Sequence, residues 1–154
     1  ERQIYSVQKS HAIYDGDRFI AILPYDGYRM TFTSINNHPL LGTQQCDCEI
    51  TPENFQKEIA AARTIGFMKE LEQLQAVGLA KGGTLENALV YDDKKCLSVP
   101  RFDDELVRHK VLDVIGDLFL LGPIKGHVIA LKSSHELNSR LSRSIMEEIR
   151  ETQQ

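Results

Sequence analysis

The sequence predicts an α+β fold: a two-layer sandwich in which a mainly antiparallel sheet packs against helices. The first third of the chain consists of short β-forming runs separated by turn signals such as Asp15-Gly16, which is typical of antiparallel hairpins. The rest alternates short strands with amphipathic helical segments. No internal repeat, low-complexity stretch or linker divides the chain. Strands followed by strand–helix alternation favour one two-layer domain over residues 1–154.

The composition is that of an ordinary globular protein, and it argues against several functional classes. The 154 residues are enough for one domain with a sizeable core, and 42% of them are hydrophobic and 26% charged. A net charge of −4 argues against nucleic-acid binding, which needs a basic surface. No apolar run reaches the ~20 residues of a transmembrane segment, and the polar opening is no signal peptide. Three cysteines, an odd number, suit a reducing compartment, so we expect a cytoplasmic protein.

Four strands are expected in the first third of the chain. β-rich runs at 4–11 and 18–24 flank the Asp15-Gly16 turn. An alternating run at 28–33 and a further run at 44–50 follow. We expect these strands to pair in chain order, as a meander.

The remaining two thirds should hold four helices and three more strands. Thr51-Pro52 is a helix start, with a capping hydroxyl followed by proline at the first position. Gly78 and Gly122-Pro123 are helix stops. The expected helices cover 52–62, 68–77, 104–121 and 135–150, and the expected strands cover 87–91, 95–99 and 126–132.

The helix expected at 104–121 carries polar side chains at four-residue spacing. His109, Asp113 and Asp117 should therefore lie one above another along one helix edge. An imidazole and a carboxylate at i and i+4 can bind one divalent cation, but a catalytic zinc normally takes three protein ligands. The alternative is an ordinary surface pair that stabilises the helix by about 0.2–0.5 kcal/mol. The spacing alone leaves both interpretations open.

Six segments, in order along nearly the whole chain, resemble one family, the zinc-dependent UDP-3-O-acyl-N-acetylglucosamine deacetylases of lipid A biosynthesis. Their order and spacing make the set far more specific than any single segment. The segments are Asp26-Gly27-Tyr28, His38-Pro39, Ala62-Arg63-Thr64-Ile65-Gly66-Phe67-Met68, Gly78-Leu79-Ala80-Lys81-Gly82-Gly83, Arg108-His109-Lys110 through Gly116-Asp117-Leu118, and Lys132-Ser133-Ser134-His135-Glu136-Leu137-Asn138.

The resemblance implies that this chain is only the second, C-terminal domain of such an enzyme. The family's enzymes contain two similar α+β domains with the active site between them. A third zinc ligand, a histidine, and a general-base glutamate belong to the N-terminal domain, which is the expected partner. The chain begins Glu1-Arg2-Gln3 without an initiator methionine, so we expect a domain excised from a longer protein, with a natural partial product as the alternative. The resemblance also implies a small β-α-β insert at about 63–91.

The resemblance assigns roles to five polar residues. His109 and Asp113 would be two of the three ligands of one Zn²⁺. His135 would stabilise the oxyanion and protonate the leaving amine, while Asp117 hydrogen-bonds His135 and holds its tautomer. Thr64 matches a threonine whose hydroxyl faces the reacting oxygen at the metal. The alternatives are a histidine at a helix start, where the helix dipole disfavours its charge, and an ordinary strand or helix-end threonine.

The resemblance also assigns a substrate surface. Lys110 and Lys132 match lysines that face the nucleotide-sugar, and cations suit its diphosphate, although a solvated surface lysine is the usual alternative. Apolar residues match a passage for the hydroxyacyl chain, where the alternative is an amphipathic helix packed on the core. These residues are Ile65, Phe67, Met68, Leu71 and Ala80.

One segment departs from the family pattern. The residues before His38-Pro39, including Asn36, lack the acidic-aromatic pair that is common there in the family. That aromatic is associated with stacking on uracil, so the resemblance does not extend to uridine recognition.

The function implied is hydrolytic removal of the N-acetyl group from UDP-3-O-(3-hydroxyacyl)-N-acetylglucosamine, the committed step of lipid A biosynthesis in the bacterial cytoplasm. The chain alone should be inactive, since two of the required groups are absent from it. The rival hypotheses are a non-catalytic module that binds acyl chains or nucleotide-sugars without metal, and a purely structural domain. Retention of His109, Asp113, Asp117 and His135 together favours the enzyme.

Overall fold

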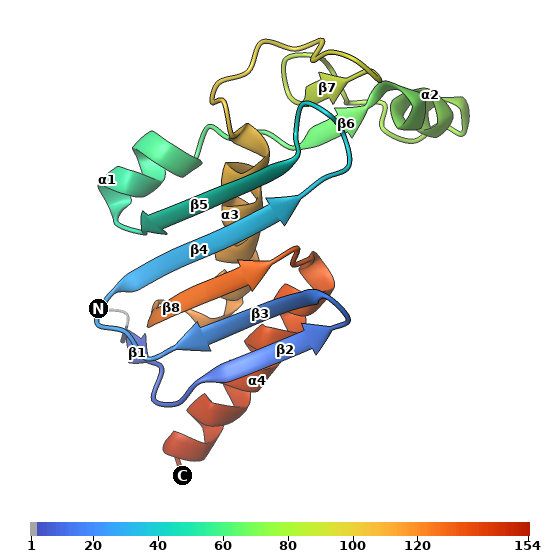
Figure 1. Ribbon diagram of the computed structural model, residues 1–154. Helices are drawn as coiled ribbons and strands as arrows, with labels where there is room; N and C mark the ends of the chain where they lie inside the picture. The colour runs from blue at the N-terminus through green and yellow to red at the C-terminus, as the bar shows by residue number, and fades with distance from the viewer. Residues whose placement is uncertain (1–2) are drawn as a thin grey trace.

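The computed structural model describes residues 3–154; Glu1 and Arg2, at which the sequence begins, lie outside the described residues. A six-stranded sheet forms one layer of the fold (Figure 1). Its strands are β1 (Tyr5–Ser6), β2 (His11–Asp15), β3 (Arg18–Leu23), β4 (Tyr28–Ile35), β5 (Thr43–Glu49) and β8 (Ile124–Leu131).

The strand order is β2-β3-β8-β4-β5, with β1 pairing with β8 off this path. The β2–β3, β3–β8 and β4–β5 pairs are antiparallel, whereas β8 runs parallel to β4 and β1. The α+β class with a mostly antiparallel sheet is confirmed. The expectation of a meander is wrong, because β8 comes from late in the chain and inserts between β3 and β4.

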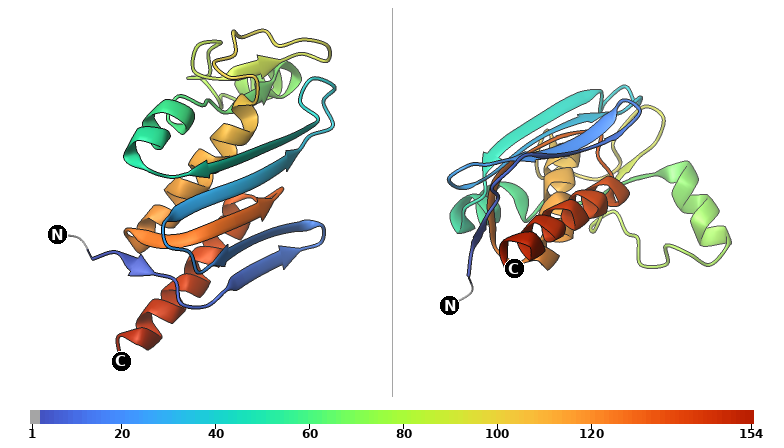
Figure 2. Two further views of the ribbon diagram at one scale, coloured as in Figure 1. Left: turned by 60° about the vertical axis from the view of Figure 1, so that its left-hand side comes forward. Right: turned by 90° about the horizontal axis from the view of Figure 1, so that it is seen from below.

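Two long helices form the second layer, α3 (Glu105–Leu118) and α4 (His135–Thr152). Both lie against the same face of the sheet (Figure 2, right). The core between the layers is made of side chains that recur at helical spacing on the helices and at every second position on the strands. Members from the helices are Val107, Val111, Val114, Leu118, Leu137, Leu141 and Ile145, and they meet Ile20, Ile22, Met30, Phe32, Val128 and Ala130 of the sheet.

A small β-α-β unit extends from one end of the sheet (Figure 1). It consists of β6 (Ile65–Phe67), α2 (Met68–Ala76) and β7 (Leu89–Tyr91), with β6 and β7 paired in parallel. This is the motif expected between about 63 and 91. The His38 ring ties it to the loop after β4, since its Nε2 lies 2.7 Å from the Asp92 carbonyl and its ring contacts those of Phe67 and Tyr91.

Three local expectations differ from the structure. The run at 4–11 is two strands, β1 and β2, separated by 7–10. The helix at 52–62 is a single turn, α1 (Pro52–Asn54), followed by a π-helical turn, η1 (Phe55–Ile59). The strand at 95–99 is wrong, because the only pairing described there is one bridge between Tyr91 and Cys96.

The last turn of the helix expected at 104–121 is the 3₁₀ turn η2 (Phe119–Leu121), which ends at Gly122 with φ +80°. Within residues 3–154, no helix is both long enough and apolar enough to cross a membrane.

Candidate metal and proton-transfer site

One edge of α3 carries four ionisable side chains at successive turns: Glu105, His109, Asp113 and Asp117. Glu105 is buried, whereas the next three are partly accessible because the helix edge emerges from the core toward its C-terminal half. The row predicted from four-residue spacing therefore exists. It extends one turn further toward the N-terminus than the sequence pattern of His109, Asp113 and Asp117 indicated.

The His109 imidazole is fixed at both ring nitrogens. Its Nδ1 lies 3.0 Å from the Ala62 carbonyl oxygen, which can only accept, so Nδ1 carries a proton and donates it. Its Nε2 points at Asp113, with 3.3 Å between Nε2 and Oδ1. The hydrogen bond to Asp113 raises the pKa of His109 despite its burial. Burial alone would raise the pKa of Asp113, but its hydrogen bond and charge interaction with His109 hold that pKa below the ordinary value.

This pair fits a zinc ion. Two ligands about 2.0–2.2 Å from zinc in tetrahedral geometry lie about 3.4 Å apart, close to the 3.3 Å between His109 Nε2 and Asp113 Oδ1. The same separation is long for a charge-assisted hydrogen bond, which runs about 2.7–2.9 Å. The Ala62 carbonyl supplies the outer partner that metal-bound imidazoles typically have, which leaves Nε2 free for the metal.

The pair is nevertheless an incomplete metal site. Over residues 3–154, no group of three His, Cys, Asp or Glu side chains is arranged to hold a metal ion. A catalytic zinc site needs a third protein ligand, so a ligand from outside this set would have to complete it.

His135 begins α4 and faces the same row. The hydroxyl of Ser134 caps the helix by accepting from the Leu137 N–H, and this places the His135 ring over α3. Its Nδ1 lies 2.7 Å from Asp117 Oδ2, and its Nε2 lies 3.9 Å from Asp113 Oδ2. The ring is 71% exposed, so Nε2 can reach a molecule bound over the Asp113 end of the row.

Asp117 is held in place by a second donor. Asn138 donates from Nδ2 to Asp117 Oδ2 over 2.9 Å, and its own Oδ1 accepts from the buried Ser133 hydroxyl over 2.7 Å. A carboxylate that already accepts from an amide is oriented before it meets His135. The Ser133–Asn138–Asp117 chain thus fixes the His135 ring by hydrogen bonds that begin in the core.

An open pocket of about 240 Å³ adjoins this row. Three cationic side chains, Arg18, Lys110 and Lys132, line it, together with Asn36 and Ile65. A smaller depression continues from the same residues to Asp113 and His135, since both hollows share Lys110 and the turn before α4.

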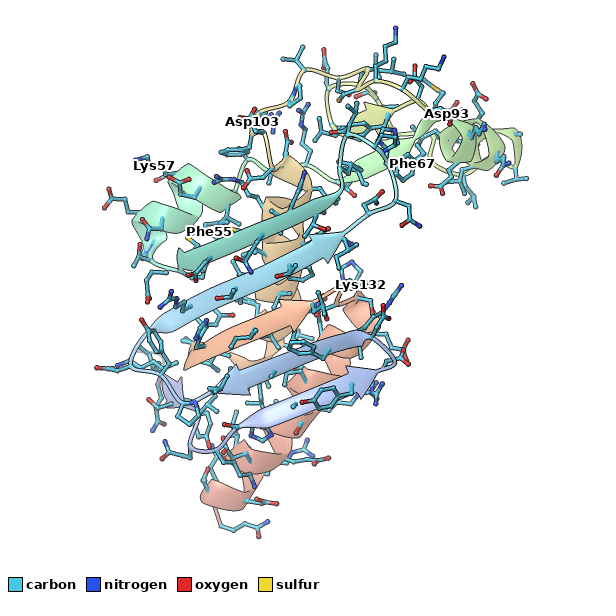
Figure 3. The ribbon with its side chains drawn as sticks, in the orientation of Figure 1. Phe55, Lys57, Phe67, Asp93, Asp103 and Lys132 are labelled. Atoms are coloured by element: carbon cyan, nitrogen blue, oxygen red, sulfur yellow. The ribbon has the colours of Figure 1, made fainter. Side chains whose placement is uncertain are left out.

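Lys132 stands at the C-terminal end of β8, at the end of the sheet from which the β-α-β unit extends (Figure 3). Its backbone has φ +51°, which turns the chain from β8 toward α4, and its amine pairs with Asp17. The conformation is unusual for a residue with a side chain, and it persists where the surroundings hold it. The Lys132 N–H donates to the Thr33 carbonyl at 2.9 Å, which anchors this turn to β4.

The apolar residues expected to form one passage lie in different places. Ile65 lines the basic pocket, while Phe67 and Met68 line a separate open hollow of about 540 Å³ between α2 and the loop after β7. Leu71 packs against the backbone of Gly66 and Gly83.

Two further predicted residues lie apart from the two pockets. Ala80 is in the turn after α2, with φ +51°. Thr64 is exposed two residues beyond Ala62, and its carbonyl accepts from the Leu89 N–H. The structure therefore brings together His109, Asp113, Asp117, His135, Lys110, Lys132 and Ile65, and it places Thr64, Phe67, Met68, Leu71 and Ala80 around them without joining them to the row.

Sequence reasoning missed three contributors to the site. The Ala62 carbonyl is a backbone group, so no side-chain pattern could indicate it. Asn138 lies at i+3 from His135, a spacing that could have suggested a shared helix face. Arg18 comes from a distant hairpin and carries no local signal.

Comparison with known proteins shows to which family the chain belongs. Residues 1–147 match the family model for UDP-3-O-acyl N-acetylglycosamine deacetylase (LpxC). Proteins named UDP-3-O-acyl-N-acetylglucosamine deacetylase are similar to the chain over nearly its whole length. The one from Oleidesulfovibrio alaskensis is 46% identical over 149 residues, which cover 95% of this chain and 49% of that protein.

Two further relatives with this name show the same coverage. The protein of Histophilus somni is 44% identical over 95% of this chain and 50% of its own length. That of Nitratiruptor sp. is 41% identical over 96% and 50%. The chain spans about half the length of the curated relatives it matches, and it belongs to the UDP-3-O-acyl N-acetylglycosamine deacetylase family.

Proposed function

We propose that this chain is the C-terminal half of a zinc-dependent deacetylase that removes the N-acetyl group from UDP-3-O-(3-hydroxyacyl)-N-acetylglucosamine. In this proposal the reaction is the committed step of lipid A biosynthesis in the bacterial cytoplasm. The observation that carries the proposal is the convergence of His109, Asp113, Asp117 and His135 on one helix edge and the facing helix start.

His109 and Asp113 would hold the metal through Nε2 and Oδ1, the two atoms that lie 3.3 Å apart. Zinc bound there would lower the pKa of a coordinated water toward neutrality and polarise the amide carbonyl. Because His109 must give up its Nε2 proton to bind a metal, metal affinity should rise with pH over the range in which His109 titrates.

His135 would act on the amide as it breaks. Hydrolysis adds water across the C–N bond and yields acetate and the sugar amine, so the nitrogen must gain a proton as it leaves. His135 donates Nδ1–H to Asp117 and presents Nε2 toward the Asp113 end of the row. The protonated ring would stabilise the developing oxyanion and then supply the proton to the amine. Asp117 offsets the unfavourable interaction of this cation with the α4 N-terminus.

The basic pocket would take the diphosphate of the substrate. Lys110 and Lys132 come from different elements and line the same hollow, with Arg18 as a third cation. Convergent cations of this kind suit phosphate oxygens. Asn36 lines the pocket as well and offers an amide rather than an aromatic face to a nucleobase.

The β-α-β unit would hold the acyl chain. Ile65 lies in the pocket beside Lys110, and Phe67 and Met68 continue along β6 to the hollow against α2. Leu71 and Ala80 would support that wall, and Thr64, at its start, would face the reacting oxygen. An alkyl chain leaving the sugar site along β6 would meet Ile65, Phe67 and Met68 on one wall, while polar and charged side chains of α2 and the loop after β7 line the rest of the hollow.

The proposal requires a second domain that supplies the remaining catalytic groups. The third ligand, a histidine, and the glutamate that takes a proton from the attacking water would come from an N-terminal domain. The isolated chain would then bind zinc weakly and would not hydrolyse the acylated nucleotide-sugar.

The test uses the full-length protein and measures bound zinc and acetate release on the acylated nucleotide-sugar. Wild-type protein should carry one zinc and release acetate, and His109→Ala should lose both. His127→Ala is a matched control, since His127 lies on the sheet and contacts Thr31 and Tyr25. A wild-type protein that binds the nucleotide-sugar, binds no zinc and releases no acetate would instead support the metal-free binding module.

A further inference from the structure

A buried ion pair lies one turn N-terminal to the metal-binding pair. Glu105, four residues before His109 on α3, is 1% exposed, and its partner Arg63 is 9% exposed. Glu105 accepts four hydrogen bonds: from Arg63 N and Nε at 2.9 Å each, from Arg63 Nη2 at 3.3 Å, and from Arg101 N at 2.6 Å. A carboxylate this thoroughly satisfied defines the position of every donor that it holds.

The segment that this pair holds is the one that orients His109. Arg63 follows Ala62, whose carbonyl accepts from His109 Nδ1. On the other side, the Ala61 carbonyl accepts from Arg101 Nη1 at 2.9 Å, and the Ala62 N–H donates to the Ile59 carbonyl at 3.0 Å. The backbone on both sides of the Ala62 carbonyl is therefore held by Arg63 and Arg101, two residues that both donate to Glu105.

The same guanidinium reaches the β-α-β unit. Arg63 Nη1 donates to the Glu86 carbonyl at 3.1 Å, and its Nη2 donates to the Val99 carbonyl at 2.7 Å. These carbonyls lie in the segments before and after β7. The Arg63 side chain thus joins the helix of the proposed metal ligands to the segments that precede and follow β7.

We propose that Arg63 and Glu105 are positioning residues that set the metal affinity and ligand geometry of His109 through the Ala62 carbonyl, and that they align the β-α-β unit with the metal. The inference rests on the proposed function, since it takes His109 to be a metal ligand. Neither residue would contact the metal, and both would act through the Ala62 carbonyl, which accepts from His109 Nδ1. An ordinary structural ion pair would alter stability but would leave the geometry at His109 Nε2 unchanged.

The experiment compares Glu105→Gln and Arg63→Lys in the full-length protein with Glu148→Gln as a matched control. Glu148 is also buried, at 3% exposure, and it accepts from Tyr5 and from the N–H groups of Gln8 and Lys9. Removing its charge costs stability at the opposite end of the sheet, where no predicted ligand lies. Arg63→Lys retains the charge but loses the planar set of donors, so it gives a second measurement if Glu105→Gln does not fold.

Two quantities are measured: zinc affinity by competition with a chelator, and the visible spectrum of the Co²⁺-loaded protein, which reports ligand geometry. Glu105→Gln and Arg63→Lys, the clamp variants, should bind zinc about 10–100-fold more weakly than wild type, and their Co²⁺ absorption bands should shift. Glu148→Gln should match wild type in both, even where its thermal midpoint falls as far. Clamp variants indistinguishable from Glu148→Gln would overturn the positioning role alone, whereas a wild-type protein that binds no zinc would overturn the proposed function as well.

Discussion

Asp117 holds two donors at once, His135 Nδ1 at 2.7 Å and Asn138 Nδ2 at 2.9 Å, whereas Asp113 faces His109. Two carboxylates one turn apart on the same helix are thus committed to different neighbours. Chemical type cannot distinguish them, but their partners can. Asp113 faces His109, as the proposed metal site requires, and Asp117 faces His135 on the neighbouring helix.

This division predicts different losses for the two substitutions. Asp113→Ala in the full-length protein should lose most of its zinc, because one of three ligands is gone. Asp117→Ala should keep its zinc and lose about 10–100-fold in turnover, because His135 loses its orienting partner. His135→Gln should likewise retain zinc and lose rate. Metal analysis alongside acetate release checks this, and equal zinc loss in the two aspartate variants would make Asp117 a ligand.

At the residue scale, the sequence could indicate side chains but not backbone partners. His109 and Asp113 follow from i, i+4 spacing, which is local and regular. The Ala62 carbonyl meets His109 across 47 positions of sequence, and only the fold brings them together. The His135–Asp117 pair came from family resemblance, because no spacing rule relates residues on two helices.

At the element scale, β8 was correctly predicted as a strand, but its position in the sheet was not predicted. Its apolar alternation predicted a strand, and α3 and α4 around it were predicted from their 3.6-residue pattern. Its place between β3 and β4 could not be predicted, since hairpin turns specify neighbours only for adjacent runs. At 4–11 and 95–99 the errors arise where single backbone hydrogen bonds, from Val7 N–H to the Lys125 carbonyl and from Leu97 N–H to the Val90 carbonyl, are not continued as a ladder.

Gly126 shows how tightly β8 is inserted. A Cβ at this position would lie 2.7 Å from Ile22 Cδ1 and 2.8 Å from Cγ1, and Ile22 is fully buried in β3. Gly126→Ala should therefore destabilise the protein by about 1–3 kcal/mol through overpacking. Gly82→Ala, where a Cβ would meet nothing within 4 Å, is the control. Thermal midpoints of the two variants decide the matter, and equal midpoints would contradict the close packing of β3 on β8.

The ion pair between Glu105 on α3 and Arg63 should make the stability of the protein depend on pH. Burial alone would raise the pKa of Glu105, but hydrogen bonds from Arg63 and Arg101 lower it below its ordinary value of 4.5. A carboxylate with a lowered folded-state pKa contributes stability above its unfolded pKa, and this contribution is lost as pH falls through the folded value. Wild type should therefore exceed Glu105→Gln in thermal midpoint above about pH 5, with the gap closing toward pH 3. A gap that stays constant down to pH 3 would show that the charge of Glu105 contributes no stability.

At the scale of the whole molecule, the site lies at one end of a two-layer domain and opens outward. The His109–Asp113 pair, the His135 ring and the basic pocket all reach the surface near the β-α-β unit. A continuous core lies between the sheet and the two helices. Among residues 3–154, no three His, Cys, Asp or Glu side chains are arranged to hold a metal ion. The chain spans about half the length of each of these relatives, and the division of the site between two domains stays a prediction.

The most direct test is acetate release from UDP-3-O-(3-hydroxyacyl)-N-acetylglucosamine by the 154-residue chain, alone and with the N-terminal half added as a separate protein. We expect no release from the chain alone, and release that depends on zinc when both halves are present. The restored activity should disappear when the added half is combined with Asp113→Ala, which shows that the ligand comes from this chain. Turnover by the 154-residue chain alone would contradict the account, since the four site residues would then suffice without a third ligand or an external base.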